Sequence, residues 1–358
     1  MDKDIFSEEN LNFLKKYLDN PSPSGHERIG QKIWVEEIKN YVDEIEVDNY
    51  GSVSAIINPG KESRVVLEAH SDEIGWSVKY IAPNGLIYVE KIGGSDVLVT
   101  PGQEVNIHTE EGVVKGVFGC TATHIRKTDY VPKINTIFID VGVLTEKKVR
   151  EMGIEIGDPI TFSSGVNFMT NRIYGRGLDN RIGGFMLIQV AKMLKENDIE
   201  LPYTLYLVNA VQEEVGKNGA KMIADSIKPN VAIVTDVTHD TTTPGISTTT
   251  KGDFKITRGP VLTHCPLMQR KLLAIIKDIA EENEIKFQKK TGVKVTGTDA
   301  DVFATSNGGV PTCLISLPMR YMHTTVEMVA KQDVKNTIKL MYLTLLGLTP
   351  DIKFNTLD

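Results

Sequence analysis

Apolar runs alternate with amphipathic segments through the second half of the chain, and this alternation restricts the fold more than any other feature. The expected strands cover Tyr203–Val211, Val231–Thr235 and Thr312–Leu317, and the expected helices cover Ile182–Lys195, Ala220–Ile227, Leu267–Ile285 and Val334–Leu346. Two further apolar runs near the N-terminus, Val53–Ile57 and Val65–Glu68, are also typical of strands. Strands that alternate with helices form parallel sheets covered by helices. The sequence therefore predicts an α/β fold with a mainly parallel sheet flanked by helices.

The segment 74–165 has a different texture. Short β-like runs lie between Gly, Pro, Asn and Asp turns, and only one helix is expected there, over Glu146–Met152. The chain of 358 residues is long enough for one large domain or for two. We expect a domain made of residues 1–73 and 166–358, interrupted by a small β-rich domain made of residues 74–165.

Charge and composition exclude several classes of protein. The chain has 40 Lys+Arg and 47 Asp+Glu, a net charge of −7, whereas nucleic acids and anionic membranes attract basic faces. No run of about 18 apolar residues is present, and the acidic start Met1–Phe6 does not resemble a signal peptide. Three scattered cysteines favour a reducing compartment. We expect a cytoplasmic protein with no nucleic-acid or membrane partner.

Polar clusters follow the apolar strands or precede a helix. In open α/β sheets, ligands bind at the edge where the strands end. The clusters contain His70 and Asp72 after the run 65–69, Glu213 and Glu214 after 206–211, Asp236 after 231–235, His323 after 314–318, and Asp179 just before a helix. Any one of them alone is more often a structural, surface or turn residue. Together, at the ends of strands of one sheet, they favour a binding site.

Two histidines and three carboxylates are a ligand set typical of zinc, cobalt or manganese. A bridging carboxylate can hold two such ions about 3.5–4 Å apart, and Asp179 is the best candidate for that bridge. One of Glu213 and Glu214 would bind metal, and the other would be free to act as a general base. The remaining histidines and Cys120, Cys265 and Cys313 are interpreted as structural, with Cys313 in the core.

Seven motifs, in this order, resemble the glutamyl and deblocking aminopeptidases. This is the tetrahedron-forming (TET-type) family of co-catalytic dinuclear metallopeptidases, some of whose members carry endoglucanase or cellulase names. The motifs are Pro21–Gly25, Ala69–Gly75, Gly175–Arg181, Gln212–Gly216, Asp236–His239, Gly297–Ala300 and Arg320–His323. Ser71 and Thr324 depart from the expected Met and Ser, but neither position supplies a ligand.

The resemblance implies a role for each site residue. His70 and Asp236 hold one divalent metal ion, Glu214 and His323 hold the other, and Asp179 bridges them. Glu213 is the general base, and Asp72 orients His70. Zinc is the first expectation, with cobalt or manganese as alternatives. The resemblance also implies a cis bond between Asp179 and Asn180, a zinc-peptidase-like catalytic domain, a β-rich dimerisation domain, and dimers that assemble into dodecamers.

The predicted function is metal-dependent removal of N-terminal residues from peptides by a metal-bridging hydroxide, with Glu213 as the base. A glycoside hydrolase is one alternative, but glycosidases need two carboxyls about 5–9.5 Å apart. Glu213 and Glu214 are consecutive and would point to opposite faces of an extended chain. Aromatic residues are also few, at 7%. A metal-binding scaffold without activity is the other alternative, and the presence of all five ligands and Glu213 argues against it.

Overall fold

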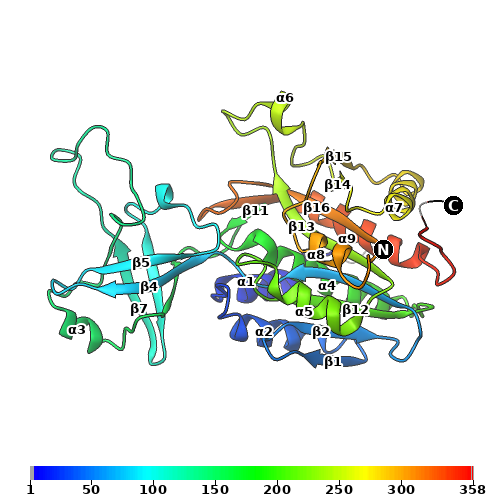
Figure 1. Cartoon of the computed structure of the whole chain (residues 1–358), viewed down its shortest axis with the longest axis horizontal. Coiled ribbons are helices and arrows are strands. Elements are labelled where there is room, and N and C mark those ends of the chain that lie inside the picture. The colour runs from blue at the N-terminus through cyan, green and yellow to red at the C-terminus, as the bar shows by residue number, and fades with distance from the viewer. Residues whose placement is uncertain (1–3, 356, 358) are drawn as a thin grey trace.

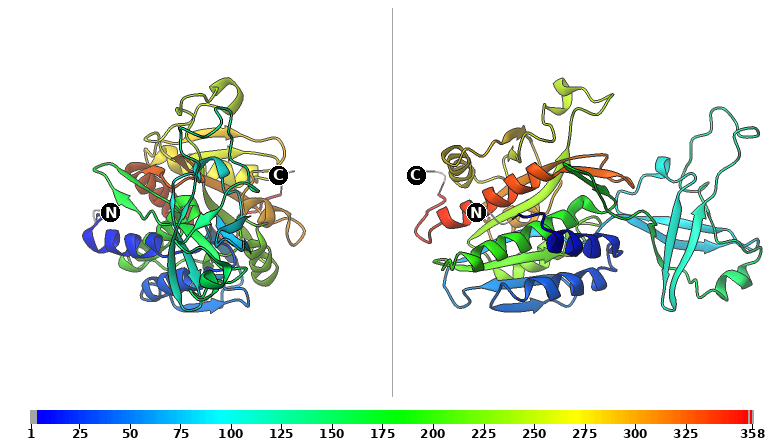
Figure 2. Two further views of the ribbon diagram at one scale, coloured as in Figure 1. Left: turned by 90° about the vertical axis from the view of Figure 1, so that its left-hand side faces the viewer. Right: turned by 180° about the vertical axis from the view of Figure 1, so that it is seen from behind.

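The computed structural model describes residues 4–355 and 357, so part of the N-terminal segment examined for a signal peptide lies outside the described residues. The described chain has a large part, in which helices cover a sheet, and a smaller β-barrel to one side (Figure 1). The right-hand view of Figure 2 shows the barrel projecting from one end of the larger part, and the left-hand view looks at the molecule from the barrel end. None of the described helices is long and apolar enough to cross a membrane.

The large part is built on a sheet of eleven strands. Along the sheet the main order is β1 (Glu44–Val47), β2 (Val53–Ile57), β12 (Thr204–Ala210), β3 (Arg64–His70), β13 (Val231–His239), β16 (Thr312–Arg320), β17 (Glu327–Ala330), β11 (Arg172–Gly175) and β10 (Asn167–Phe168), with β14 (Val261–His264) pairing β15 (Gln288–Thr291) and β16. The central strands β12, β3, β13 and β16 are parallel neighbours.

The prediction of an α/β fold is confirmed, but the prediction of a mainly parallel sheet is wrong, because the sheet is mixed. β1–β2–β12 on one side and β16–β17–β11–β10 on the other pair antiparallel. The physical reason is connection length: short links such as those between β1 and β2 and between β16 and β17 reverse the chain, whereas parallel neighbours need a long crossover. The apolar runs indicated the strands without indicating these directions.

Helices cover both faces of the central strands. They are α1 (Glu8–Asp19), α2 (Arg28–Ile38), α4 (Leu178–Glu196), α5 (Asn218–Ile227), α7 (Arg270–Glu282), α8 (Ala300–Thr305) and α9 (Lys331–Gly347). The short helix α6 (Thr248–Lys251) lies on a loop that projects away from the sheet (Figure 1). Val65 and Leu67 of β3 pack in one core with α1, α2, α4, α7 and α9, while Val66 packs in a second core with α5 and α8. Burial on both faces explains why β3 is a continuous apolar run.

The smaller part is a closed six-stranded barrel in the order β4 (Gly75–Ile81), β5 (Ile87–Ile92), β8 (Ile139–Asp140), β7 (Gly112–Phe118), β6 (Glu104–Thr109) and β9 (Pro159–Phe162). All six strands come from the segment for which the sequence predicts a β-rich domain, and α3 (Glu146–Arg150) is its helix. Trp76 and Phe118 meet edge to face at 5.4 Å in a third apolar core. The barrel thus has a core of its own.

Candidate active site

Three neighbouring parallel strands bring residues of the predicted site to one edge of the sheet. His70 is the last residue of β3, Asp236 lies near the end of β13, and Glu213 and Glu214 follow β12 within a turn. Parallel strands end at the same edge, which is where open α/β sheets bind ligands. Asp179 reaches this edge from the start of α4. The peptide bond between Asp179 and Asn180 is cis, as the resemblance implied.

Asp179 lies between two histidines. Its Oδ1 is 3.2 Å from Nε2 of His70, and its Oδ2 is 3.3 Å from Nε2 of His323. Nε2 of His70 is also 3.8 Å from Oδ1 of Asp236, and Nε2 of His323 is 3.3 Å from Oε1 of Glu214. The residues therefore form two groups, each with ligand atoms within 4.8 Å of one another, and Asp179 belongs to both.

The other ring nitrogen of each histidine faces an acceptor. Nδ1 of His70 is 3.2 Å from the carbonyl oxygen of Asp72, and Nδ1 of His323 is 3.2 Å from that of Gly94. When Nδ1 donates its proton to a carbonyl, Nε2 is left as a free lone pair, which is the arrangement common in metal-binding histidines. Both Nε2 atoms are directed at the carboxylates of the two groups.

Asp72 fixes the chain segment that carries the two glutamates. Its Oδ1 accepts a hydrogen bond from the N–H of Glu213 at 3.0 Å, and its Oδ2 accepts one from the N–H of Glu214 at 3.1 Å. The Ser24 hydroxyl donates to the same Oδ2 at 2.5 Å. Asp72 is fully buried, so its carboxylate depends on these donors and on Nδ1 of His70, 3.4 Å away.

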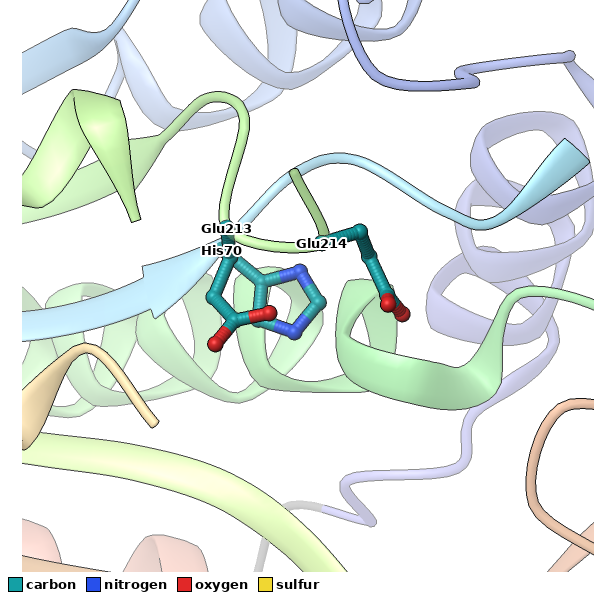
Figure 3. Close-up of side chains that lie close together, drawn as sticks. All are labelled: His70, Glu213 and Glu214. Carbon is teal, nitrogen blue, oxygen red and sulfur yellow. The ribbon is translucent and has the colours of Figure 1, made fainter. Parts of the chain in front are cut away.

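Glu213 and Glu214 both reach the site, contrary to the expectation that consecutive side chains would point to opposite faces. The residues after β12 form a turn and not an extended strand, so the alternation of a strand does not apply. Figure 3 shows both side chains extending from one stretch of chain toward the region of the His70 ring. One oxygen of each glutamate lies within 4.8 Å of a ring nitrogen of His70.

A cavity of about 240 Å³ opens onto these groups. It is lined by the predicted metal ligands and Glu213, and by Val237, Thr238, His239, Lys290, Thr296, Gly297, Thr298 and Met322. A larger cavity, of about 470 Å³, lies near Arg258 and Phe287 and is lined by none of the residues of the predicted site. The size of this larger cavity alone therefore does not make it the better candidate for the active site.

The site holds more negative charge than its own cations balance. Burial raises the pKa of Glu213 to about 9 and that of Asp236 to about 8; the charge of His70 opposes both shifts. Burial also disfavours the ionised form of Asp179. The hydrogen bonds from His323 and His70 have the larger effect and lower the pKa of Asp179. Burial disfavours charged His323, but Asp179 and Glu214 raise its pKa to about 11. Grouped buried carboxylates of this kind are stabilised by bound cations.

Glu327 is a site residue that the sequence reasoning missed. Its Oε1 accepts a hydrogen bond from the N–H of His323 at 2.8 Å, and its Oε2 accepts one from the N–H of Asp179 at 3.1 Å. It is buried, and burial together with the charge of Asp179 raises its pKa. In the sequence, the acidic Glu327 comes directly before the apolar run 328–330, and this is the signal from which it could have been found.

Two further buried carboxyls that interact electrostatically with His70 were given no role from the sequence, although one of them lies in the motif Gly297–Ala300. Glu68 lies in β3 and Asp299 precedes α8, and both are almost completely buried. Burial and the charge of Asp299 raise the pKa of Glu68, and burial raises that of Asp299 to about 6. Glu68 was interpreted only as part of a strand, because a single acid in an apolar run gives no sign of its partner.

Other residues of the motifs surround Glu73 and give it a structural role. Nη1 of Arg176 donates to both oxygens of the Glu73 carboxylate. The carboxylate also lies 3.3 Å from Nη1 of Arg181 and accepts a hydrogen bond from the N–H of Ser22 at 2.8 Å. Arg181 is fully buried. Three motifs that are far apart in the sequence therefore meet at one buried charge. Elsewhere, Cys313 lies in the core as predicted, whereas His239, which was given no role, lines the cavity.

A family model described as M42 glutamyl aminopeptidase matches residues 51–340. The chain belongs to the M42 glutamyl aminopeptidase family. A lysyl aminopeptidase of Pyrococcus furiosus is 33% identical over 345 residues, which cover 94% of this chain and 97% of that relative. The resemblance found in the sequence motifs is thus confirmed, and the M42 family and this relative support aminopeptidase activity.

Two solved structures share the whole architecture of this M42 chain. A TET aminopeptidase from a marine sediment Thaumarchaeota archaeon has a TM-score of 0.89 and 30% identity, covering 96% of this chain and 99% of its own. A TET1 peptidase of Pyrococcus horikoshii that can assemble into a tetrahedron or a large octahedral shell has a TM-score of 0.82 and 29% identity, covering 93% and 98%. The α/β fold with its separate small barrel is therefore the fold of TET peptidases.

Proposed function

We propose that the protein is a dinuclear metallo-aminopeptidase that removes N-terminal residues from peptides. The observation that carries the proposal is the position of Asp179, whose two oxygens each face the Nε2 of a different histidine. His70 and Asp236 would hold one divalent ion, and Glu214 and His323 the other, with Asp179 shared. Zinc, cobalt and manganese all suit this set of nitrogen and oxygen ligands.

The donor set supports this assignment by its chemistry as well as by its geometry. Among the described residues that line the cavity, Met322 alone carries sulfur, as a thioether, so hard or borderline ions are favoured over soft ones. Both histidines have Nδ1 beside a backbone carbonyl, as ligating histidines usually do. Cations bound here would also offset the burial that raises the pKa values of Glu213 and Asp236.

Divalent ions held by these ligands would supply a water of lowered pKa and would polarise the scissile carbonyl. Glu213 takes a proton from the attacking water and returns it to the departing amine, which completes one turnover. Asp72 keeps Glu213 in reach by holding its backbone N–H. Glu327 holds the backbones of Asp179 and His323 at the same time. The substrate's cationic α-amino group is attracted to the acidic end of the cavity, which favours cleavage next to a free N-terminus.

We further propose that residues 1–73 and 166–358 form the catalytic domain and residues 74–165 a dimerisation domain. The closed barrel has its own apolar core, as an inserted domain requires. The assembly of the related TET1 peptidase into a closed shell supports a homo-oligomer, with dimers building a dodecamer. A cytoplasmic location stays a prediction, supported by three cysteines that form no disulfide.

The two alternative functions have less support. Because Glu213 and Glu214 lie in a turn after β12, the argument that they cannot face one substrate no longer applies. The glycoside hydrolase is instead set aside because of the family assignment and because histidines lie beside the carboxylates. An inactive scaffold would not need Glu213 beside His70 in addition to five metal ligands. Chelator sensitivity separates all three functions.

The test is hydrolysis of a panel of aminoacyl chromogenic substrates and of a cellulose-type glucan. Each is run with the purified protein, after chelation, and after adding back zinc, cobalt or manganese. We expect aminoacyl cleavage that disappears with the chelator and returns with metal. Glucan cleavage that survives chelation, without aminoacyl cleavage, would overturn the proposal. Correctly folded, metal-loaded protein with no hydrolysis of any substrate would support a scaffold.

A further inference from the structure

Residues 296–298 line the active-site cavity, and one buried carboxylate holds this wall in place. Oδ1 of Asp301 accepts hydrogen bonds from the N–H and from the hydroxyl of Thr296, both at 2.7 Å. Oδ2 of Asp301 accepts a hydrogen bond from the N–H of Gly297 at 2.9 Å. Asp301 is buried in the first turn of α8 and is not among the residues that line the cavity. The position of the wall therefore depends on a side chain outside the cavity lining.

The same carboxylate binds Lys217. Nζ of Lys217 donates to Oδ2 of Asp301 at 3.2 Å. Lys217 directly precedes α5, and its N–H donates to the carbonyl oxygen of Glu213 at 2.9 Å, which closes the turn 213–217. Its φ is 60°, a left-handed conformation that residues other than glycine adopt only where surrounding contacts hold them. Asp301 is thus one of the contacts that fix the end of this turn.

The ion pair between Lys217 and Asp301 is largely shielded from solvent. The side chain of Asp301 is 11% exposed and that of Lys217 is 23% exposed. Burial disfavours the ionised form of Asp301, but hydrogen bonds from Thr296 and Gly297 and the charge of Lys217 have the larger effect and lower its pKa. Both partners are therefore charged at neutral pH, and salt screens a shielded pair less than a surface pair.

Two carboxylates hold the two ends of the turn 213–217. Asp72 accepts hydrogen bonds from the backbone N–H groups of its first two residues, at 3.0 and 3.1 Å. Asp301 binds the side chain of its last residue, Lys217. Glu213 therefore lies in a segment that is fixed at both ends, and the contact at the far end leads to the cavity wall.

We propose that the ion pair between Lys217 and Asp301 positions the base Glu213 relative to the cavity wall 296–298. The effect on turnover rests on the proposed aminopeptidase function. Neither partner of the pair lines the cavity, so both are positioning residues and not catalytic residues. A hydrogen bond between two charged groups is stronger and more directional than one between neutral groups, which suits a contact that has to fix a distance.

Hydrogen exchange of backbone amides tests this connection without turnover. Lys217→Met removes the charge and keeps a straight side chain, and it should speed exchange several-fold both in the turn 213–217 and at residues 296 and 297. Lys217→Arg keeps a cation that can donate to Asp301, and it should exchange like the unmodified protein. Lys221→Met is the matched control, because Lys221 is exposed one turn further along α5, and it should leave both segments unchanged.

The variants should remain folded, because α5 and α8 also pack against each other through apolar side chains. Ala220 and Ile223 of α5 lie in one buried core with Ala300 and Phe303 of α8. All exchange and kinetic measurements are made at the same metal loading, and kcat is expressed per folded chain, with circular dichroism and elemental analysis as the checks. A loss of folded protein is thereby separated from a displaced base.

Kinetics on an aminoacyl chromogenic substrate test whether the contact positions the base. Lys217→Met should lower kcat roughly 3- to 10-fold, the effect of one lost hydrogen bond, and should leave KM nearly unchanged. Asp301→Asn should lower kcat to a similar extent and also raise KM, because the cavity wall loses its own hydrogen bonds. The double variant should have the kcat of Asp301→Asn alone, since both changes break one contact. Lys217→Arg should restore kcat.

Each contrary result overturns a stated part of the inference. Unchanged exchange at residues 296 and 297 in Lys217→Met shows that the ion pair does not connect the turn to the wall. Additive losses of kcat in the double variant, or an equal loss in Lys221→Met, exclude the positioning of Glu213 by this pair and leave the aminopeptidase function intact. Absence of aminoacyl cleavage by every form, the unmodified protein included, overturns the proposed function, and the exchange measurement then decides the connection by itself.

Discussion

The carboxylate of Asp72 accepts a hydrogen bond from the backbone N–H of Glu213 over 3.0 Å. The same carboxylate faces Nδ1 of His70 and accepts from Glu214 and Ser24. One buried side chain therefore sets the position of a proposed metal ligand and of the proposed base. This arrangement gives Asp72 a positioning role that is separate from contact with the substrate.

Replacing Asp72 by Asn should impair the active site more than the fold. The amide would point a donor at N–H groups that also donate, so the turn carrying Glu213 would shift. We expect kcat to fall by a factor on the order of 10–100, the usual effect of losing such an outer contact of a metal ligand. The measurement is kcat on an aminoacyl substrate, with bound metal and circular dichroism recorded alongside.

Ser24→Ala is the milder companion to Asp72→Asn. It removes one hydrogen bond to Asp72 and leaves the two backbone donors in place. The loss of one hydrogen bond is worth about 1 kcal/mol, so activity should fall only several-fold. If Asp72→Asn had no larger effect than Ser24→Ala, the positioning role of Asp72 would be wrong.

Glu213→Gln should bind metal and lose turnover. Glutamine has nearly the shape of glutamate but cannot accept a proton from water at neutral pH. We expect kcat to fall by roughly 10²–10⁴, the contribution typical of general acid–base catalysis, with two divalent ions still bound per chain by elemental analysis. Glu282→Gln, on the exposed side of α7, is the control that should change nothing. Near-full activity of Glu213→Gln would exclude Glu213 as the base.

Gly94→Ala should displace His323. A Cβ atom at position 94 would lie 2.6 Å from Nδ1 of His323, closer than real contacts allow, and the carbonyl of Gly94 faces this same nitrogen. We expect weaker metal retention and lower kcat, measured by metal content after dialysis and by turnover. Gly292→Ala is a control, because its Cβ would meet Cys265 at an ordinary 3.6 Å. Unchanged metal retention in Gly94→Ala would show that the barrel loop does not constrain His323.

The pH dependence of the free energy of unfolding should reveal the raised pKa of Glu27. This buried side chain accepts hydrogen bonds from the N–H groups of Gly25 and Gln212. Burial, and then the charge of Asp72, raise the pKa of Glu27 from 4.5 to about 7. The folded state therefore binds more protons than the unfolded state between these values, and its stability falls as pH rises from 4.5 to about 7.

Glu27→Gln should remove that contribution, because the amide carries no charge and can still accept the two hydrogen bonds. Relative to the unmodified protein, the variant should gain up to ~3 kcal/mol in the free energy of unfolding at pH 8 and little at pH 4.5. Urea unfolding at several pH values, at constant metal content, provides the measurement. Glu9→Gln, at an exposed position of α1, should follow the unmodified protein. Parallel profiles for Glu27→Gln and the unmodified protein would contradict the role of Glu27.

The features that the sequence predicts well are local or periodic. The strand Val53–Ile57 has the predicted bounds, and β3 and β12 match within a few residues, because a strand buried on both faces is apolar at most positions. The polar clusters were noticed for the same reason: His70 and Asp236 interrupt such runs where the strands end. The order of the motifs was sufficient to identify the family, which the family model confirms.

The sequence by itself determined an α/β chain, a β-rich segment between residues 74 and 165, and a short set of residues able to bind metal. Only the tertiary structure decided the antiparallel sides of the sheet, the closure of the barrel, and the contacts of Glu327, Gly94 and Lys290 with the site. These features depend on which distant segments pack together and in which direction. Hydrophobic periodicity records whether a side chain is buried, but it carries no information about the partner against which that side chain is buried.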